Sequence, residues 1–166
     1  MKFYIKPNHF AQYRSFKIRD ESQGELFKIK GKFFLGLRRL TIKDMNGEML
    51  YTVKRICTLN FYRTYIVKNE LNEEVARISR TFARNKPLYM VTMKDYIIHF
   101  EGDIHSHSFS LHDEKEKLVE IKKGEFPFGE AFEINVTTER KTLLHLFLVV
   151  AIDQMNHERK KYKSAA

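Results

Sequence analysis

A short pattern of apolar and polar positions occurs four times along the chain. Its first half is an apolar residue, any residue, an aliphatic residue, a basic residue and then Asp or Asn. It occupies residues 16–20, 40–44, 65–69 and 109–113. A second half, in the order apolar, polar, aliphatic, polar, follows at 27–30, 51–54, 76–79 and 119–122. Because alternation with period two is typical of β-strands, each repeat predicts a strand, a polar turn and a returning strand.

The first returning strand shows how the two faces of these segments divide. Phe27 and Ile29 fall on one side, and three lysines alternate with them on the other. A half-buried antiparallel strand gives this division. Turn signals separate about twelve such segments, and a divergent hairpin over residues 88–101 lies between the third and fourth repeats. The number and spacing of the segments are typical of an all-β barrel or sandwich.

The C-terminal part of the chain breaks this alternation. Residues 143–152 are apolar all round a helical wheel except for His145, and we expect a helix over residues 138–158 with Thr138 as its N-cap. A membrane-spanning helix needs about 20 apolar residues, whereas this run is shorter and ends at Asp153. A helix that is apolar on every side must be surrounded by other structure.

The hairpins are the structure available to surround this helix. We therefore predict a mainly β fold, a closed antiparallel barrel of about twelve strands around a central hydrophobic C-terminal α-helix. Residues 1–166 are expected to form a single domain, with the hairpin barrel over 1–137, the central helix over 138–158 and a basic tail over 159–166. A buried strand in place of the helix is the alternative, because the run contains two adjacent valines.

The net charge of +9 is unevenly distributed. Residues 1–94 carry 20 Lys and Arg against 8 Asp and Glu, whereas residues 95–166 carry 10 against 13. The asymmetry indicates an anionic partner for the N-terminal part, either a membrane or a nucleic acid, and a solvated surface without a partner is the alternative. The single cysteine, Cys57, excludes an internal disulfide, fits a reducing compartment and is expected to be a small residue in or near the core. The N-terminus lacks an apolar run of signal-peptide length, so we expect a cytoplasmic protein.

Three segments, taken in order, resemble the LURP-one-related proteins and their short bacterial relatives in the tubby C-terminal-like superfamily. They are MKFYIK at 1–6, GKFF at 31–34 and LVVAID at 148–153. The resemblance covers nearly the whole chain and implies a barrel of about twelve strands enclosing a hydrophobic helix. Tubby members bind phosphoinositide headgroups on the barrel exterior, and the related phospholipid scramblases act at membranes. The chain matches no headgroup motif that we recognise and the bacterial members imply no established activity, so the resemblance assigns no binding residue.

Recurring basic residues are the first candidate site. A barrel filled by its helix has no enclosed cavity, so we expect any partner to contact the outward strand faces or the loops. The candidate ligand-binding residues are Lys28, Lys30, Lys32, Arg39, Lys54 and Arg77. Each cation close to an anionic bilayer contributes about 1 kcal/mol, so three or four together would give a weak, reversible and salt-sensitive attachment. An ordinary solvated exterior is the alternative.

Histidines are the second group of candidates. His105 and His107 are expected on one face of a strand, where they would supply two metal ligands, with His99 as a third from across a hairpin. Two histidines at this spacing do not by themselves make a metal site, and we predict no metal, no cofactor and no catalytic residue. His145 is expected to make a buried hydrogen bond to the barrel wall, with Asp153 near a barrel mouth. No glycine-rich phosphate loop occurs, and we do not expect an enzyme.

Three functions follow from these observations. The first is a non-enzymatic tubby-like module that docks on anionic phospholipid or phosphoinositide-like headgroups, or on another phosphorylated ligand, through a basic outer face. The second is a structural or protein-interaction barrel whose partner the sequence does not name. The third is nucleic-acid binding, which is disfavoured because few aromatic residues have outward parity for base stacking. We expect a monomer, peripheral at the membrane in the first case.

Overall fold

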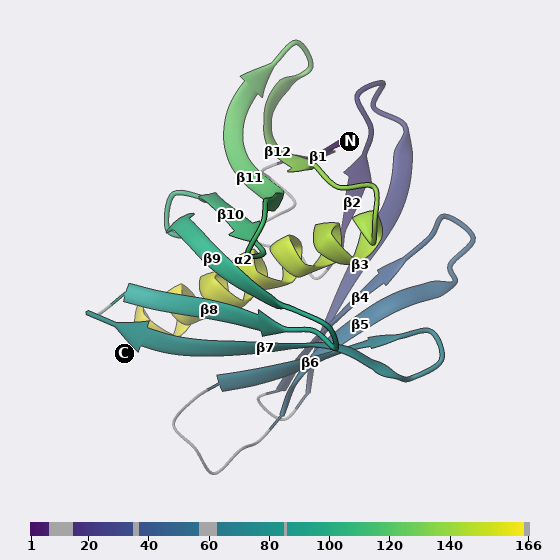
Figure 1. Ribbon diagram of the computed structural model, residues 1–166. Helices are drawn as coiled ribbons and strands as arrows, with labels where there is room; N and C mark the ends of the chain where they lie inside the picture. The colour runs from purple at the N-terminus through teal and green to yellow at the C-terminus, as the bar shows by residue number, and fades with distance from the viewer. Residues whose placement is uncertain (7–14, 35–36, 57–62, 85, 165–166) are drawn as a thin grey trace.

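The chain folds into a barrel of antiparallel strands with a helix inside it (Figure 1). The computed structural model describes residues 1–6, 15–34, 37–56, 63–84 and 86–164, and these form twelve strands and one helix. The strands are β1 (Lys2–Ile5), β2 (Ser15–Arg19), β3 (Glu25–Phe34), β4 (Leu37–Lys43), β5 (Met49–Ile56), β6 (Arg63–Asn69), β7 (Glu74–Ala83), β8 (Lys86–Thr92), β9 (Ile97–Asp103), β10 (Ser108–His112), β11 (Lys117–Phe126) and β12 (Gly129–Val136). The helix is α2 (Thr142–Ser164). The predicted mainly β fold is confirmed.

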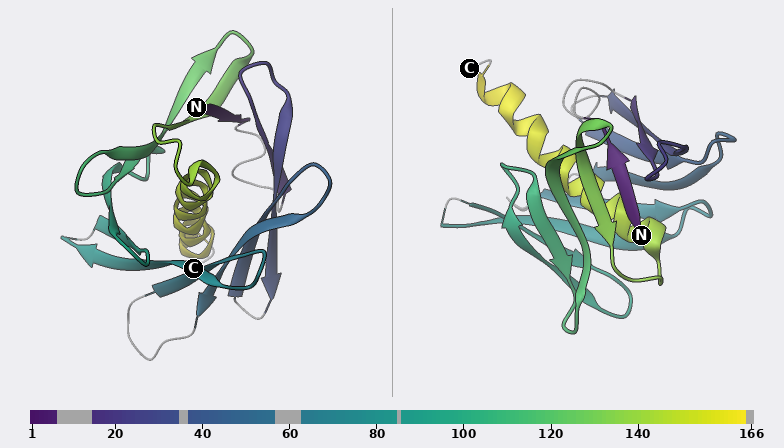
Figure 2. Two further views of the ribbon diagram at one scale, coloured as in Figure 1. Left: turned by 45° about the vertical axis from the view of Figure 1, so that its right-hand side comes forward. Right: turned by 90° about the horizontal axis from the view of Figure 1, so that it is seen from above.

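Strands that follow one another in the chain are neighbours in the wall, and the first strand closes the ring (Figure 2). β1 pairs with β12 through four residue pairs but with β2 through one, Tyr4 with Arg19. A second weakly paired position lies between β8 and β9, which share three residue pairs next to their turn. Elsewhere each described strand pairs with its neighbours over four or more residues, so the predicted closed antiparallel barrel is confirmed.

The four repeats form the hairpins β2–β3, β4–β5, β6–β7 and β10–β11 and share one turn chemistry. In each turn the side-chain oxygen of the Asp or Asn accepts a hydrogen bond from a backbone N–H three or four residues later. The pairs are Asp20 with Gly24 at 2.8 Å, Asp44 with Glu48 at 2.9 Å, Asn69 with Glu73 at 2.9 Å and Asp113 with Glu116 at 2.8 Å. In all four hairpins the register also shifts between the aliphatic and the basic residue of the motif. The repeat therefore encodes an Asx-type turn followed by a β-bulge, which adds twist to the wall.

The aliphatic positions of the repeats point into the barrel. Those of the first halves, Ile18, Ile42, Val67 and Leu111, are at most 1% exposed, and those of the second halves, Ile29, Val53, Ile78 and Ile121, are at most 2% exposed. These side chains surround α2, which runs along the inside of the ring (Figure 2). Each fully buried aliphatic side chain contributes about 1.5–3 kcal/mol. The inner faces of the repeats and the helix therefore form one shared core.

Burial of α2 is complete over most of the apolar run that the sequence contains. Residues 146–152 are all 0% exposed, and Phe147 stacks on Tyr51 of β5 with ring centroids 6.1 Å apart. The adjacent valines at 149 and 150 are helical, so the alternative of a buried strand is wrong. Contacts with the wall on all sides override their β propensity.

The helix begins and ends later than the sequence indicated. It spans Thr142–Ser164 rather than 138–158, so the segment 159–166, expected to be a tail, continues as helix as far as Ser164. Thr138 does not cap the first turn, because its hydroxyl oxygen lies 3.2 Å from Nδ1 of His145. No helix in the described part of the chain has both the length and the apolar character needed to cross a membrane.

Replacing Val149 by Asp tests whether the helix and the wall share one core. Val149 is 0% exposed, and an uncompensated carboxylate there should cost about 5 kcal/mol or more, enough to unfold a domain of ordinary stability. We expect loss of the β-sheet circular dichroism signal, since the wall cannot close without its helix. The control is Leu71→Asp in the exposed β6–β7 turn, where the side chain is 71% exposed and the melting temperature should stay unchanged. A Val149→Asp protein with an intact, cooperative β-sheet transition would contradict the shared core.

Candidate functional site

Three of the predicted basic residues form a row across three adjacent strands. Lys32 of β3 lies opposite Arg39 of β4, and Arg39 lies opposite Lys54 of β5. All three side chains are exposed, and among the described residues none of them has an ion-pair partner. Residues directly opposite in an antiparallel pair have Cβ atoms about 4.5–5.5 Å apart, and like charges at this spacing destabilise the sheet. The row is therefore electrostatically unfavourable unless an anion lies over it.

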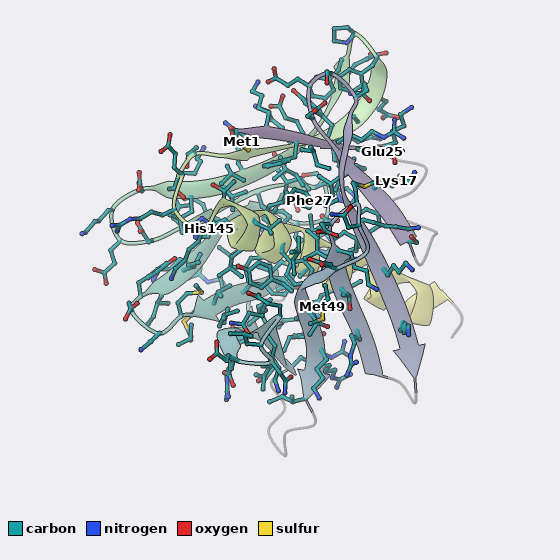
Figure 3. All side chains as sticks on the ribbon, turned by 90° about the vertical axis from the view of Figure 1, so that its right-hand side faces the viewer. Met1, Lys17, Glu25, Phe27, Met49 and His145 are labelled. Carbon is teal, nitrogen blue, oxygen red and sulfur yellow. The ribbon has the colours of Figure 1, made fainter. Side chains whose placement is uncertain are left out.

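A second row of cations lies four residues away along β3 and β4 and includes β2 instead of β5. Lys17 of β2 lies opposite Lys28 of β3, and Lys28 lies opposite Lys43 of β4. Lys17 is neutralised by Glu25, whose two carboxylate oxygens accept hydrogen bonds from its ammonium group at 2.7 and 2.8 Å (Figure 3). This contact lowers the pKa of Glu25, so the carboxylate stays charged. The other two lysines of the row have no such partner in the described part of the chain.

Lys30 lies between the two rows. Its neighbours on the adjacent strands are Ser15 and Thr41 rather than charged residues. Thr41 in turn faces Thr52, and their hydroxyl oxygens are 3.3 Å apart. The rows and Lys30 form one surface, defined here as the basic face, made of Lys17, Lys28, Lys30, Lys32, Arg39, Lys43 and Lys54. Five of the six predicted ligand-binding residues belong to it, so the barrel brings these five together.

Arg77, the sixth predicted residue, lies apart from the basic face. Ile66 of β6 separates it from Lys54 in the same cross-strand row. Its guanidinium group donates two hydrogen bonds to the carboxylate of Glu74, at 2.9 and 3.1 Å. This contact raises the pKa of Arg77 and neutralises its charge locally. The sequence repeat placed it with the others, but the equivalent position in a later repeat lies further round the ring.

A recess of about 240 Å³ opens at the edge of the basic face, where β1 and β2 share their single residue pair. Its lining is formed by Lys6, Ser15, Phe16, Lys17, Arg19 and Lys28. Glu25 contacts both Lys17 and Arg19, the latter at 3.1 Å, so one carboxylate pairs with two of the four cations. Sequence reasoning missed Lys6, which follows β1, and Lys17 and Arg19 of β2. Lys17 and Arg19 alternate with buried residues on β2, and this alternation is the sequence signal that could have identified both.

Basic and acidic residues also lie on different sides of the wall. Strands β2 to β5 hold ten lysines and arginines and a single carboxylate, Glu25. Strands β9 to β12 hold three lysines and six carboxylates. These two groups of strands face each other across the ring. One side of the barrel is therefore strongly basic and the other weakly acidic, a field that orients the molecule toward anionic surfaces.

The histidine pair does not form the arrangement that the sequence indicated. Residues 104–107 make the turn between β9 and β10, so His105 and His107 are not on one face of a strand. His105 is exposed, whereas Nδ1 of His107 lies 2.8 Å from Oδ1 of Asp153, which is fully buried in α2. His99 lies opposite His112 on β10 instead of joining the pair. Among the described residues no three His, Cys, Asp or Glu side chains are grouped to hold a metal ion.

His145 makes polar contacts at the N-terminal end of the helix. It is 2% exposed, and its Nε2 lies 3.3 Å from the hydroxyl of Tyr96 while its Nδ1 lies 3.2 Å from that of Thr138. Burial, with a smaller contribution from the nearby Lys141, lowers the pKa of His145 from 6.5 to about 4. A neutral imidazole can accept one of these bonds and donate the other, so His145 ties the helix to the wall as a structural residue.

A second recess, of about 310 Å³, lies on the outside of β9, β10 and β11. There Oγ of Ser110 is 2.7 Å from Nε2 of His112, and Glu101 is 3.5 Å from the same nitrogen. In a Ser–His–acid triad the carboxylate holds the other ring nitrogen, so this group does not have the geometry of a nucleophilic site. Cys57, the remaining candidate nucleophile, lies outside the described residues.

The comparisons with known proteins agree with the fold. The family model LURP-one-related matches residues 1–153. The chain belongs to the LURP-one-related family. The resemblance in the three sequence segments is thus confirmed.

One known protein and one solved structure are similar to this chain over most of its length. An uncharacterised Bacillus subtilis protein, YxjI, is 21% identical over 157 residues, covering 93% of each chain. An X-ray structure of a protein from Arabidopsis thaliana has a TM-score of 0.62 at 16% identity and covers 93% of this chain and 90% of that one. At such identity the structural match shows a shared fold.

Lowering the pH tests the buried imidazole. Because the folded state disfavours protonation of His145, its contribution to stability is present above the unfolded pKa of 6.5 and is lost as the pH falls from 6.5 toward about 4. Urea unfolding across this range should show a decrease that is smaller in His145→Gln. His99→Gln, an exposed position, should retain the wild-type decrease. Identical pH profiles for wild type and His145→Gln would contradict the buried neutral state.

Proposed function

We propose that this protein is a non-enzymatic binding module that docks on anionic phospholipid membranes through its basic face. The observation that carries the proposal is the pair of cation rows, in which Lys32, Arg39 and Lys54, and likewise Lys17, Lys28 and Lys43, lie opposite one another. The rows contain four directly opposed like-charge pairs. In three of them, all but Lys17–Lys28, neither cation has an ion-pair partner among the described residues, so these pairs oppose folding. A plane of anionic headgroups relieves that repulsion at every position at once.

The shape of the surface favours a membrane over a nucleic acid. The cations project from the outside of four adjacent strands, a broad surface suited to many headgroups at once. Strand-bound single-stranded nucleic acids need aromatic platforms beside the cations. The outward positions between the cations hold Ser15, Thr41 and Thr52 instead. The recess lined by four cations offers a place for one phosphate group at the edge of this surface.

The strength expected of this attachment is modest. Each lysine or arginine near an anionic surface contributes about 1 kcal/mol and is screened beyond about 8 Å at physiological ionic strength. Binding is therefore reversible, falls with salt and needs no lipid insertion. It would place the protein at the membrane periphery.

Vesicle co-sedimentation tests the proposal with a charge-matched control. Replacing Lys30, Lys32 and Lys54 by Gln should weaken binding to phosphatidylserine vesicles by roughly a hundredfold, from the loss of about 3 kcal/mol. The control replaces Lys86, Lys94 and Lys115 by Gln, exposed residues of β8 and of two turns on the other side of the ring. It makes the same change in net charge and should weaken binding much less.

Further binding measurements distinguish an anionic membrane from the other candidate ligands. Pure phosphatidylcholine vesicles should not bind, and inorganic phosphate at matched ionic strength should not displace the protein from anionic vesicles if a surface is recognised. Equal weakening in the two triple variants would contradict the basic face as the binding surface. Tight binding to single-stranded RNA with no binding to vesicles would favour the nucleic-acid alternative.

A further inference from the structure

The wall of the barrel splits between β8 and β9. The strands share residue pairs at Met90–His99, Val91–Ile98 and Thr92–Ile97, all next to their turn. Beyond these pairs the strands diverge, as Figure 1 shows, and the residues 86–89 and 100–103 have no partners across the gap. β8 stays paired with β7 and β9 with β10 on their other sides. Each strand therefore presents one unpaired edge toward the split.

The hydrogen-bond pattern identifies which backbone groups face the split. The N–H of Met93 donates to the carbonyl of Tyr96 at 2.9 Å, which makes this turn-closing pair hydrogen-bonded. Because hydrogen-bonded and non-bonded pairs alternate along an antiparallel ladder, Val91–Ile98 is the next bonded pair. By the same alternation, the N–H and C=O groups of Phe100 and Gly102 are directed away from β10 toward the split, where no described strand pairs with them.

The two edges differ in their capacity to accept a strand. On β8 the same alternation brings Pro87 to the split, and proline has no N–H to donate. On β9 both backbone positions retain their donor and acceptor. The edge of β9, defined here as Phe100–Asp103, is therefore the one with a usable set of backbone groups.

Exposed apolar side chains lie on the two strands that border the split. Leu88, Met90 and Ile97 are 45%, 40% and 42% exposed and make up half of the large exposed hydrophobic residues in the described part of the chain. Phe100, itself half-buried, points inward and contacts Tyr89 across the split with ring centroids 5.7 Å apart. An added strand would cover apolar surface on the outside through its outward residues and contact Phe100 through its inward ones.

The charges along the edge decide what kind of strand fits. The outward side chains of the β9 edge are Glu101 and Asp103, both exposed, and hydrogen bonds from the backbone N–H of His105 and from Ser106 lower the pKa of Asp103. Two carboxylates at alternate positions attract a strand with basic residues beside them. They also repel the same edge of a second copy, since natural proteins use edge charges to prevent self-pairing.

We propose that the β9 edge binds an extended segment of a partner protein as an added β-strand, with apolar residues at alternate positions and lysine or arginine between them. Backbone hydrogen bonds to Phe100 and Gly102 would supply affinity, and Glu101 and Asp103 the preference for basic residues. In the ring of strands β9 lies opposite β3. The proposed strand-binding edge and the basic face are thus separate surfaces, and either can be correct without the other.

A synthetic peptide of alternating Lys and Val tests this inference by fluorescence anisotropy with the full-length chain. We expect it to bind at least about tenfold more tightly than the same peptide with alternate backbone amides N-methylated, because methylation removes the ladder donors. An alternating Glu and Val peptide should also bind at least about tenfold more weakly, because it places like charges beside the edge. Equal binding of all three peptides, or no binding of the Lys and Val peptide, would overturn the proposal.

Hydrogen exchange and a charge-reversed variant locate the peptide. On saturation the amides of Phe100 and Gly102 should exchange more slowly, while that of Glu101, which faces β10, should not change. Glu101→Lys combined with Asp103→Lys should weaken peptide binding at least about tenfold, whereas Glu114→Lys with Glu116→Lys in the β10–β11 turn should leave it unchanged. Protection confined to other strands, or equal effects of the two variants, would show that the peptide binds elsewhere. Vesicle binding measured alongside reports on the basic face independently.

Discussion

The fold depends on the burial of one helix that is apolar on every side. A helix with a single apolar stripe can lie on the surface of a sheet, but residues 146–152 of α2 are fully buried around their whole circumference. A wall that surrounds the helix is the arrangement that meets this demand in a chain of hairpins. The inward aliphatic residues of the repeats supply the contacts. The helix then fills the interior, so the outer faces and edges of the wall are the surfaces left for binding.

The turns determine how the wall curves. In each repeat an Asp or Asn accepts a backbone hydrogen bond across the turn, and the returning strand then carries one extra residue opposite the aliphatic and basic residues of the motif. The extra residue in each bulge bends its strand and increases local twist. Four such hairpins give the curvature that closure requires. At each bulge two consecutive apolar residues of the returning strand, such as Leu118 and Val119, pack on the core.

The outer surface carries charge that the fold itself does not need. An outward strand position requires only a polar residue, yet Lys17, Lys28 and Lys43 lie opposite one another, as do the three cations of the neighbouring row. Thr41 and Thr52, which lie between the rows, show that uncharged residues are compatible with this part of the wall. The unfavourable charge therefore lies on a part of the wall in which each strand pairs with its neighbour over five or more residues. The split between β8 and β9 is the opposite case, since there the wall lacks pairing and exposes apolar residues.

Alternation, turn residues and the apolar run were sufficient to predict the strands, the helix and their enclosure from the sequence, because each depends on neighbours in the chain. The basic residues of a strand were predictable for the same reason, since parity places Lys28, Lys30 and Lys32 on one face. The partners across strands depended on register, which a single sequence does not specify. Register brought Arg39 and Lys54 to Lys32, separated Arg77 from them, and left Phe100 without a paired residue on β8. The contact between Asp153 and His107 was likewise not predictable, because the position of a buried helix along the barrel axis is set by packing of the whole wall.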